Sequence, residues 1–423
     1  MIAYNPIFYL ENAKNAILIS SQGGICMGAV GIVAEYNPFH SGHLYQLRRI
    51  RRERGEDTPV VAVMSGDFVQ RGEPACFSKY ARAEAAVRCG VSLVLELPVP
   101  WSVSSAEGFA RGAVGLLAAS GVADTISFGS ECGDTARLRA CAEVLEDAAF
   151  PERLRAALAE GVSFAAARER AAAELAGEET ASVLRSPNDL LAVEYIRAAD
   201  RMGFSPGLLC VQRTGSRHDG PGSASEIRQR MDADDSWPDA LPAAAAEVFR
   251  REIEAGRGPV TAAAMSLPMV SRLRERTTAD FAALPDASEG LEHSLYAAAR
   301  REITPEAMAR SVKSKRYALS RLRRMLLCAA LGIREGDTPA AAPYLRVLAA
   351  DEKGIALLRQ MRDRAKLPVI VKPARARELD TGARAVFEQN SRAHDFYVLG
   401  FPAAENRQGG EDWRTTPFIR GDS

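Results

Sequence analysis

Several features that mark particular classes of protein are absent from this sequence of 423 residues. No apolar run approaches the roughly 18 residues that a membrane-spanning helix needs. The first 26 residues carry Lys14 as their one basic side chain, so they contain no basic signal region. The seven cysteines include no CxxC pair, which argues against a zinc ribbon or a redox motif. We therefore expect a cytoplasmic protein with reduced thiols and no membrane partner.

Lysine is also scarce, since only seven of the 54 basic residues are lysine, and the formal net charge is zero. A neutral chain has no general attraction for nucleic acid, but an average over the chain hides local basic clusters. The hydrophobic content of 47% and the charged content of 26% are typical of a globular protein. The length suffices for roughly two or three domains.

The N-terminal half alternates between strand and helix patterns. Its predicted strands are apolar throughout, as expected for a parallel sheet that helices cover on both faces. The class indicated is α/β, with a Rossmann-like doubly wound parallel sheet. The predicted strands are 28–35, 59–64, 92–97, 122–128 and 206–213, and the predicted helices are 42–54, 78–89, 105–119 and Ala-rich stretches within 134–202.

Beyond residue 235 the pattern changes to helices with Pro and Gly breaks, and LPVIVK at 367–372 is a possible short strand. Residues 1–26 show no clear period, and Met27 is a candidate for the true start. The predicted parts are an extension (1–26), an α/β domain (27–235), a mostly helical region (236–400) and a tail (401–423). The predicted helices of the second half are 241–256, 288–300, 306–331 and 353–365.

Two histidines follow the first predicted strand in the run His40-Ser41-Gly42-His43. In an open α/β sheet, ligands bind at the carboxyl ends of the strands, where a helix N-terminus offers unpaired N–H groups to an anion. Both imidazoles can face one phosphate there, while Gly42 lacks the Cβ that would hold a nucleotide away. Such donors stabilise charge on an α-phosphate as pyrophosphate leaves. A shared zinc ion is the alternative, but no suitably placed carboxylate or cysteine completes it, so we assign no metal ligand.

The run from His40 to His43 resembles the HxGH signature of the nucleotidyltransferase superfamily. The stretches GIVAEYNPFHSGHLYQL (31–47) and VAVMSGDFVQRGEPACFSKYARAEAAVRCGVSLVLELP (61–98) resemble a narrower group, the bacterial tRNA(Met) cytidine acetate ligases. The resemblance implies ATP-dependent acetylation of N4 of the wobble cytidine, C34, in elongator tRNA(Met), with free acetate as the donor. Further similar stretches are 128–134, 186–196, 223–231, 288–293 and 313–327.

The same resemblance implies residues that hold the nucleotide. Gly129, Asn188 and Arg213 match nucleotide-contacting positions, and Mg²⁺ is expected to accompany ATP. The loop expected to hold ATP comprises Val33, Ala34, Glu35, Tyr36, Asn37, Pro38, Phe39, His40, Ser41, Gly42, His43, Leu44, Tyr45 and Gln46.

Acetate needs activation before an amine can displace its oxygen. We expect acetate to attack the α-phosphorus of ATP, giving acetyl-adenylate and pyrophosphate, with His40 and His43 stabilising the developing charge. The cytidine N4 would then attack the acetyl carbonyl and release AMP, without an acyl-enzyme. Lys79 is the only lysine between residues 15 and 312. Its ammonium is expected to neutralise the triphosphate or position acetate, the alternative being a solvated surface lysine.

Two later segments are expected to contact phosphate groups, one those of ATP and the other those of tRNA. Ser223 and Glu226 have capping-box spacing, and the Ser-rich loop before Ile227-Arg228 is expected to close on the phosphates, unless it only caps a helix. Residues 310–324 contain seven basic side chains and no acidic one, which predicts an amphipathic helix docked by leucines, with a cationic outer face for tRNA phosphates. The residues expected to contact tRNA are Lys313, Arg316 and Arg324, with possible extensions at 48–52 and 362–377.

Two other functions remain open from the residues alone. A small-molecule adenylyltransferase would use the same HxGH chemistry without an RNA partner, although it would need little beyond the α/β domain. A protein that binds ATP without turnover, as a regulator or an RNA scaffold, would also keep the motif.

Overall fold

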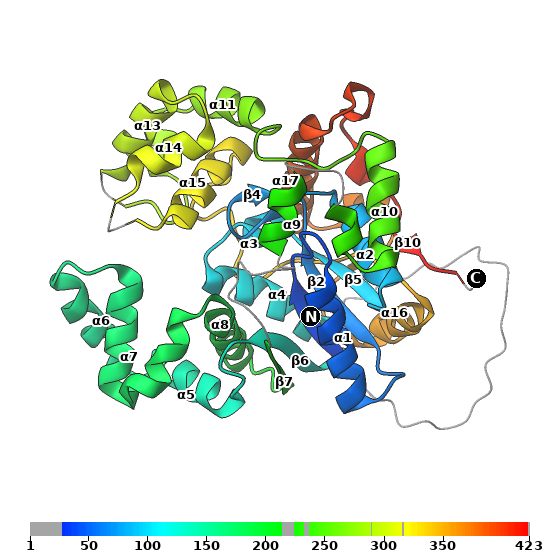
Figure 1. Ribbon diagram of the computed structural model, residues 1–423, viewed down its shortest axis with the longest axis horizontal. Helices are drawn as coiled ribbons and strands as arrows, with labels where there is room; N and C mark the ends of the chain where they lie inside the picture. The colour runs from blue at the N-terminus through cyan, green and yellow to red at the C-terminus, as the bar shows by residue number, and fades with distance from the viewer. Residues whose placement is uncertain (1–27, 214–223, 232–236, 289, 315–316, 422–423) are drawn as a thin grey trace.

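A mostly parallel sheet forms the centre of the computed structural model (Figure 1). Its strands are β1 (Ala29–Ala34), β2 (Val60–Ser65), β5 (Leu93–Leu97), β6 (Ala123–Ser130), β7 (Gly207–Gln212), β8 (Leu345–Ala350), β9 (Val369–Ile370) and β10 (Phe418–Ile419). The order is β10-β8-β5-β2-β1-β6-β7, with β9 beside β8, and among the described strands of this sheet only β5 and β8 pair antiparallel. The structure describes residues 28–213, 224–231, 237–288, 290–314 and 317–421, so the predicted extension and Met27 lie outside it.

Helices surround this sheet, and a short hairpin of β3 (Phe68–Val69) and β4 (Glu73–Pro74) follows β2 (Figure 1). None of the helices in the described ranges has both the length and the apolar character to span a membrane. They are α1 (Ser41–Arg54), α2 (Lys79–Arg88), α3 (Val99–Ser102), α4 (Ala106–Ser120), α5 (Thr135–Leu145), α6 (Phe150–Ala159), α7 (Phe164–Ala181), α8 (Pro187–Arg201), α9 (Ala224–Met231), α10 (Ala243–Glu254), α11 (Ser266–Arg274), α12 (Thr278–Ala282), α13 (Leu291–Arg301), α14 (Pro305–Val312), α15 (Leu319–Leu331), α16 (Glu352–Arg364) and α17 (Thr381–Tyr397).

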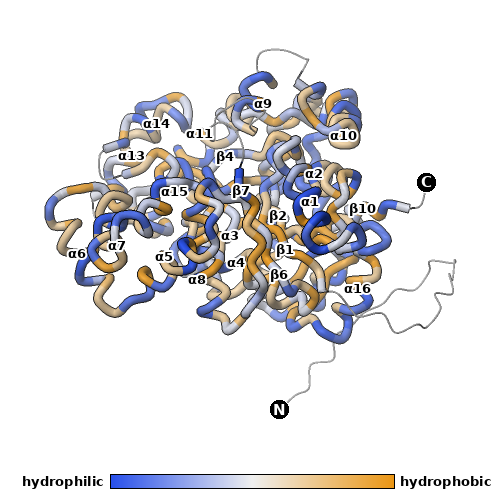
Figure 2. The backbone as a smooth tube through the Cα atoms, turned by 60° about the horizontal axis from the view of Figure 1, so that its bottom comes forward, coloured by the Kyte–Doolittle hydropathy of each residue, from blue (hydrophilic) through white to orange (hydrophobic). Residues whose placement is uncertain are grey.

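The sheet is buried on both faces, as its apolar strands predict. Successive side chains of a strand point to opposite faces. Val61 and Val63 of β2 therefore join the core under α4 and α8, while Ala62 and Met64 join the core under α1 and α2. Figure 2 shows β1, β2 and β6 in the hydrophobic colours between the surrounding helices. The doubly wound α/β class is confirmed.

The helices α11 to α15 pack around a third core, beside the sheet. Phe281, Leu295, Met308 and Leu322 are completely buried there. The single helix predicted over 306–331 is two helices, because α14 ends at Val312 and α15 begins at Leu319.

The C-terminal boundaries require correction. Strand β8 lies between β5 and β10, so the chain returns to the α/β sheet inside the region predicted to be helical (236–400). Strand β10 belongs to the same sheet, so the described part of the predicted tail, residues 401–421, is attached to the α/β domain. The short strand predicted at 367–372 is present as β9. The α/β domain therefore contains both ends of the described chain, and the helical group is an insertion into it.

Candidate active site

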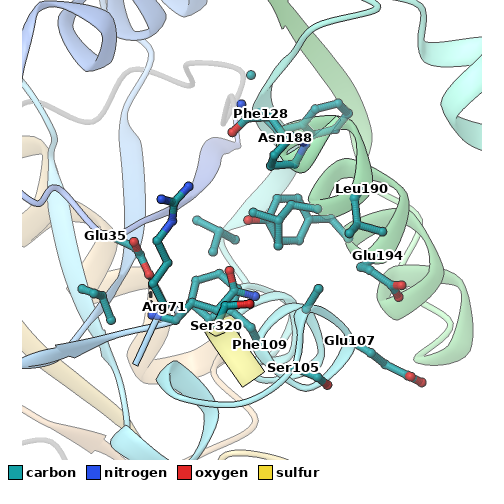
Figure 3. A pocket seen from close by; sticks show the side chains of 18 of the residues that line it. Glu35, Arg71, Ser105, Glu107, Phe109, Phe128, Asn188, Leu190, Glu194 and Ser320 are labelled. Atoms are coloured by element: carbon teal, nitrogen blue, oxygen red, sulfur yellow. Dashed lines mark hydrogen bonds between the residues drawn. The ribbon is translucent and has the colours of Figure 1, made fainter. Parts of the chain in front are cut away.

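A cleft of about 1830 Å³ opens at the carboxyl ends of β1 and β6. Its lining comes from the segment between β1 and the first turn of α1, from α8, from the β3–β4 hairpin, from α6 and α7, and from the start of α15. In Figure 3, Glu35 and Arg71 lie across the cleft from Asn188, Leu190 and Glu194 of α8. The cleft thus lies between the α/β domain and the helical insertion.

The two histidines of the HxGH run cap helix α1 together. Nδ1 of His40 accepts a hydrogen bond from the N–H of Gly42 at 3.0 Å, and Nδ1 of His43 accepts one from the N–H of His40 at 3.2 Å. A neutral imidazole carries a single proton, so each ring must hold it on Nε2. The cap therefore leaves one Nε2–H donor on each histidine for a ligand.

Both rings are neutral at physiological pH. Burial, reinforced by the charges of Arg213 and Arg228, lowers the pKa of His40 to about 4. Burial and the neighbouring His40 lower the pKa of His43 well below 6.5. Arg228 is oriented by its hydrogen bond to the carbonyl oxygen of Asn37, at 2.8 Å. The arginines can thus supply positive charge to an anion while the imidazoles supply hydrogen bonds.

The glycine between the histidines is needed for a reason that differs from the prediction. A Cβ on Gly42 would lie 2.7 Å from Cε1 of His40 and 3.0 Å from its Nδ1. Such contacts would push the imidazole away from the helix N-terminus. Gly42 therefore makes room for the His40 ring, in addition to any space that it leaves for a nucleotide.

Most residues predicted to hold ATP lie on the cleft surface, and their contact with a nucleotide stays a prediction. Pro38, Phe39 and Leu44 do not line the cleft. Phe39 is fully buried, with its ring centroid 5.0 Å from that of Tyr36, and Leu44 packs against the same core. Phe39 and Leu44 therefore anchor the loop to the hydrophobic core. The residues on the cleft surface are Val33, Ala34, Glu35, Tyr36, Asn37, His40, Ser41, Gly42, His43, Tyr45, Gln46, Gly129, Asn188 and Arg213.

The structure contradicts the predicted role of Lys79. The residue opens α2 as expected, but its side chain is completely buried and does not line the cleft. Its Nζ lies 2.7 Å from Oε1 of Glu96 and 2.8 Å from the carboxylate of Asp412. Arg346 pairs with the same Asp412 carboxylate at 2.8 Å. Because the two carboxylates already neutralise this ammonium, it joins the C-terminal segment to the sheet and cannot meet a triphosphate or acetate.

The basic residues near α15 are also placed differently from the prediction. The apolar stripe is present, since Leu322 is completely buried. Arg324, however, has only 15% of its side chain exposed and lines the cleft, and its backbone lies against Gly72 beside the hairpin. Lys313 is exposed and lines the same cleft, whereas Arg316 lies outside the described residues. The cationic side of this segment therefore faces the α/β domain, and its contact with tRNA stays a prediction.

Part of the cleft wall was missed by sequence analysis. The β3–β4 hairpin brings Gln70 and Arg71 to the cleft from the run QRGEP, which contains too few residues for a strand pattern. Arg228 of α9 lines the cleft, whereas the Ser-rich loop before α9, including Ser223, lies outside the described residues, so its closure on the phosphates stays a prediction. The sequence feature that could have indicated this part of the cleft wall is the polar pair Gln70-Arg71 directly before Gly72, a residue typical of a tight turn.

No protein site for a metal ion is found among the described residues, where no group of three His, Cys, Asp or Glu side chains is suitably arranged. The Nδ1 atoms of His40 and His43 are occupied in capping α1.

Comparisons with known proteins agree with this geometry. Residues 27–412 match the family model described as HIGH Nucleotidyl Transferase. The tRNA(Met) cytidine acetate ligase of Thermoanaerobacter sp. is 36% identical over 89% of this chain and 96% of its own length, and that of Syntrophomonas wolfei is 35% identical over 92% and 99%. The crystal structure of Thermotoga maritima TmcAL bound with alpha-thio ATP has a TM-score of 0.86 at 36% identity, covering 93% of this chain and 99% of that chain. The chain therefore belongs to the HIGH nucleotidyl transferase family and, within it, to the tRNA(Met) cytidine acetate ligases.

Proposed function

We propose that this chain is an ATP-dependent ligase that acetylates N4 of the wobble cytidine, C34, of elongator tRNA(Met), with free acetate as the donor. The observation that carries the proposal is the pair of neutral histidines at the N-terminus of α1, inside a cleft of about 1830 Å³. Pockets for small ligands usually have volumes of roughly 300–1,000 Å³. The cleft has room for an RNA nucleotide beside ATP, which favours this function over that of a small-molecule adenylyltransferase.

In the first step, ATP lies over the N-terminus of α1 with its α-phosphate near His40, His43 and Arg213. An acetate oxygen attacks the α-phosphorus, the bond to the oxygen that bridges to the β-phosphate breaks, and pyrophosphate leaves with the electron pair. The Nε2–H donors and the helix N-terminus stabilise the charge that develops on the phosphate oxygens. Because acetate is an anion and both imidazoles are neutral donors, this step needs no proton transfer.

In the second step, the cytidine N4 attacks the carbonyl carbon of the acetyl-adenylate, and AMP leaves. The mixed anhydride is reactive enough for an amine to attack it directly, so no nucleophilic Ser or Cys is required. Mg²⁺ usually binds substrate phosphates and water with one or two carboxylates. We propose that it enters with the triphosphate, where it would offset phosphate charge.

Pyrophosphate release tests this function when acetate, ATP and tRNA are each omitted in turn. Release that requires ATP and acetate, with acetylcytidine appearing at C34 only when tRNA is added, is the expected result. Release that requires a phosphorylated metabolite would assign the chain to the small-molecule adenylyltransferases. ATP binding without pyrophosphate release under any condition would leave only a binding function.

The exposed Lys313 gives a test of the RNA surface. We expect Lys313→Glu to weaken tRNA binding and to lower the slope of log affinity against log salt by about one unit, because one phosphate contact is lost. The measurement is filter binding at several salt concentrations. Lys353→Glu is the matched control, since Lys353 is exposed on α16 and pairs with Asp57 at 3.0 Å. An unchanged slope for Lys313→Glu would place the phosphate contacts elsewhere.

A further inference from the structure

Five carboxylate side chains of the described residues line the cleft, and Glu35 differs from the other four in its ion pairing. Glu35 has no ion pair with any described residue. Its Oε1 accepts a hydrogen bond from the N–H of Gln70 at 2.7 Å, and no hydrogen bond from the described residues reaches its Oε2. The other four are neutralised by ion pairs: Glu73 with Arg323, Glu107 with Arg201, Glu194 with Arg197 and Asp286 with Arg324.

The position of Glu35 is fixed from two sides. Glu35 directly follows β1, and its carbonyl oxygen accepts a hydrogen bond from the buried guanidinium of Arg82. Its carboxylate is tied to the hairpin through Gln70. Figure 3 shows Glu35 beside Arg71, with Ser320 of α15 on the same side of the cleft. The carboxylate therefore lies where the loop that carries the histidines meets the wall made by the hairpin and α15.

The groups that face Glu35 leave it able to exchange a proton. They are Arg71 of the hairpin, Arg82 of α2, Arg228 of α9 and Tyr195 of α8. Burial raises the pKa of Glu35, and the hairpin N–H and the three arginines offset this only in part. Guanidinium groups keep their charge in proteins, and burial raises the pKa of Tyr195, so this phenol stays protonated. A carboxyl group whose pKa is moved toward neutrality is a better base at physiological pH.

We propose that Glu35 is the general base of the acetyl-transfer step, a role that rests on the proposed function. The lone pair of the cytidine N4 attacks the acetyl carbonyl carbon, and Oε2 of Glu35 takes one N4 proton as the C–N bond forms. The tetrahedral centre then collapses, the bond from this carbon to the phosphate oxygen breaks, and AMP leaves with the electron pair. The proton passes from Glu35 to water. The adenylation step releases no proton, so the base acts in acetyl transfer alone.

Glu35→Gln is the direct test, because glutamine keeps an oxygen that can accept from the N–H of Gln70. The enzyme is loaded with acetate and ATP and mixed with tRNA, and single-turnover formation of acetylcytidine is compared with acetate-dependent exchange of pyrophosphate into ATP. We expect transfer to fall by about 100-fold or more, and by a much larger factor than exchange. The wild-type transfer rate should rise with pH and reach a plateau, and Glu35→Gln should lose this inflection. Glu35→Asp should restore part of it.

Glu73→Gln is the matched control, since Glu73 lines the same cleft but is paired with Arg323 at 2.9 Å. It should keep the inflection in the pH profile. Equal losses of exchange and transfer in Glu35→Gln would mean that Glu35 acts on the nucleotide, and unchanged transfer would mean that it takes no proton. Either result overturns the inference. Absence of acetate-dependent exchange in the wild-type protein would instead overturn the proposed function itself.

Discussion

Replacement of His43 by alanine is expected to lower acetate-dependent pyrophosphate formation by about 100- to 1,000-fold, the usual effect of losing one preorganised donor to a developing charge. The ring is held by its contact with the N–H of His40, so its Nε2–H needs no reorganisation when the α-phosphate becomes more negative. Because the pKa of both histidines is lowered, the rate should not change with their protonation between about pH 6 and pH 9. Initial rates of pyrophosphate release at saturating ATP measure the effect.

His40 needs a variant that separates capping from catalysis. Loss of its N-cap would cost about 1 kcal/mol of helix stability, so His40→Ala changes two properties together. His40→Ser keeps an N-cap hydrogen bond acceptor while removing the imidazole, and it should still lose activity as His43→Ala does. His293→Ala is the control, because this histidine on α13 is 75% exposed. Full activity in His43→Ala or His40→Ser would exclude that ring from the reaction.

The first strand and helix illustrate what could be predicted from the sequence. Strand β1 and helix α1 begin and end within about one residue of the predicted ranges 28–35 and 42–54. A strand buried on both faces is apolar at nearly every position, which is a strong local signal, and the HxGH run directly follows it. The cleft could be placed for the same reason, because ligands of such sheets bind where the strands end.

Strand β8 shows why the C-terminal part of the sheet was not predicted. Its sequence LRVLAA is short and carries Arg346, and a charged residue in a central strand argues against that assignment. Arg346 is nevertheless buried, because Glu96 and Asp412 neutralise its guanidinium at 3.3 and 2.8 Å. Both partners are distant in the sequence, so no local sequence pattern predicts the pairing. Lys79 was assigned to the phosphates for the same reason, because the sequence does not indicate that Glu96 and Asp412 lie beside it.

These residues form one buried ion network that closes the α/β domain. Lys79 of α2 and Arg346 of β8 share the carboxylate of Asp412, which also accepts a hydrogen bond from the OH of Tyr80 at 2.6 Å. Burial alone would raise the pKa of Asp412, but the charges of Arg346 and Lys79 hold it well below its ordinary value. The carboxylate is therefore ionised, and two cations depend on it for neutralisation. The network links the C-terminal residues to helix α2 and to strands β5 and β8.

Asp412→Ala is therefore expected to lower the free energy of unfolding by about 3–5 kcal/mol, because it leaves buried cations without their shared counterion. Denaturant titration followed by circular dichroism measures the loss, and the midpoint should fall with little change in slope. Asp57→Ala is the matched control, since it breaks the ion pair with Lys353 in which Asp57 is 98% exposed, and solvent screens that pair. Equal stability of the two variants would show that the C-terminal segment does not hold the domain together. A large loss in Asp412→Ala alone, with pyrophosphate formation retained below the unfolding transition, would establish that this carboxylate stabilises the fold without taking part in the chemistry of the cleft.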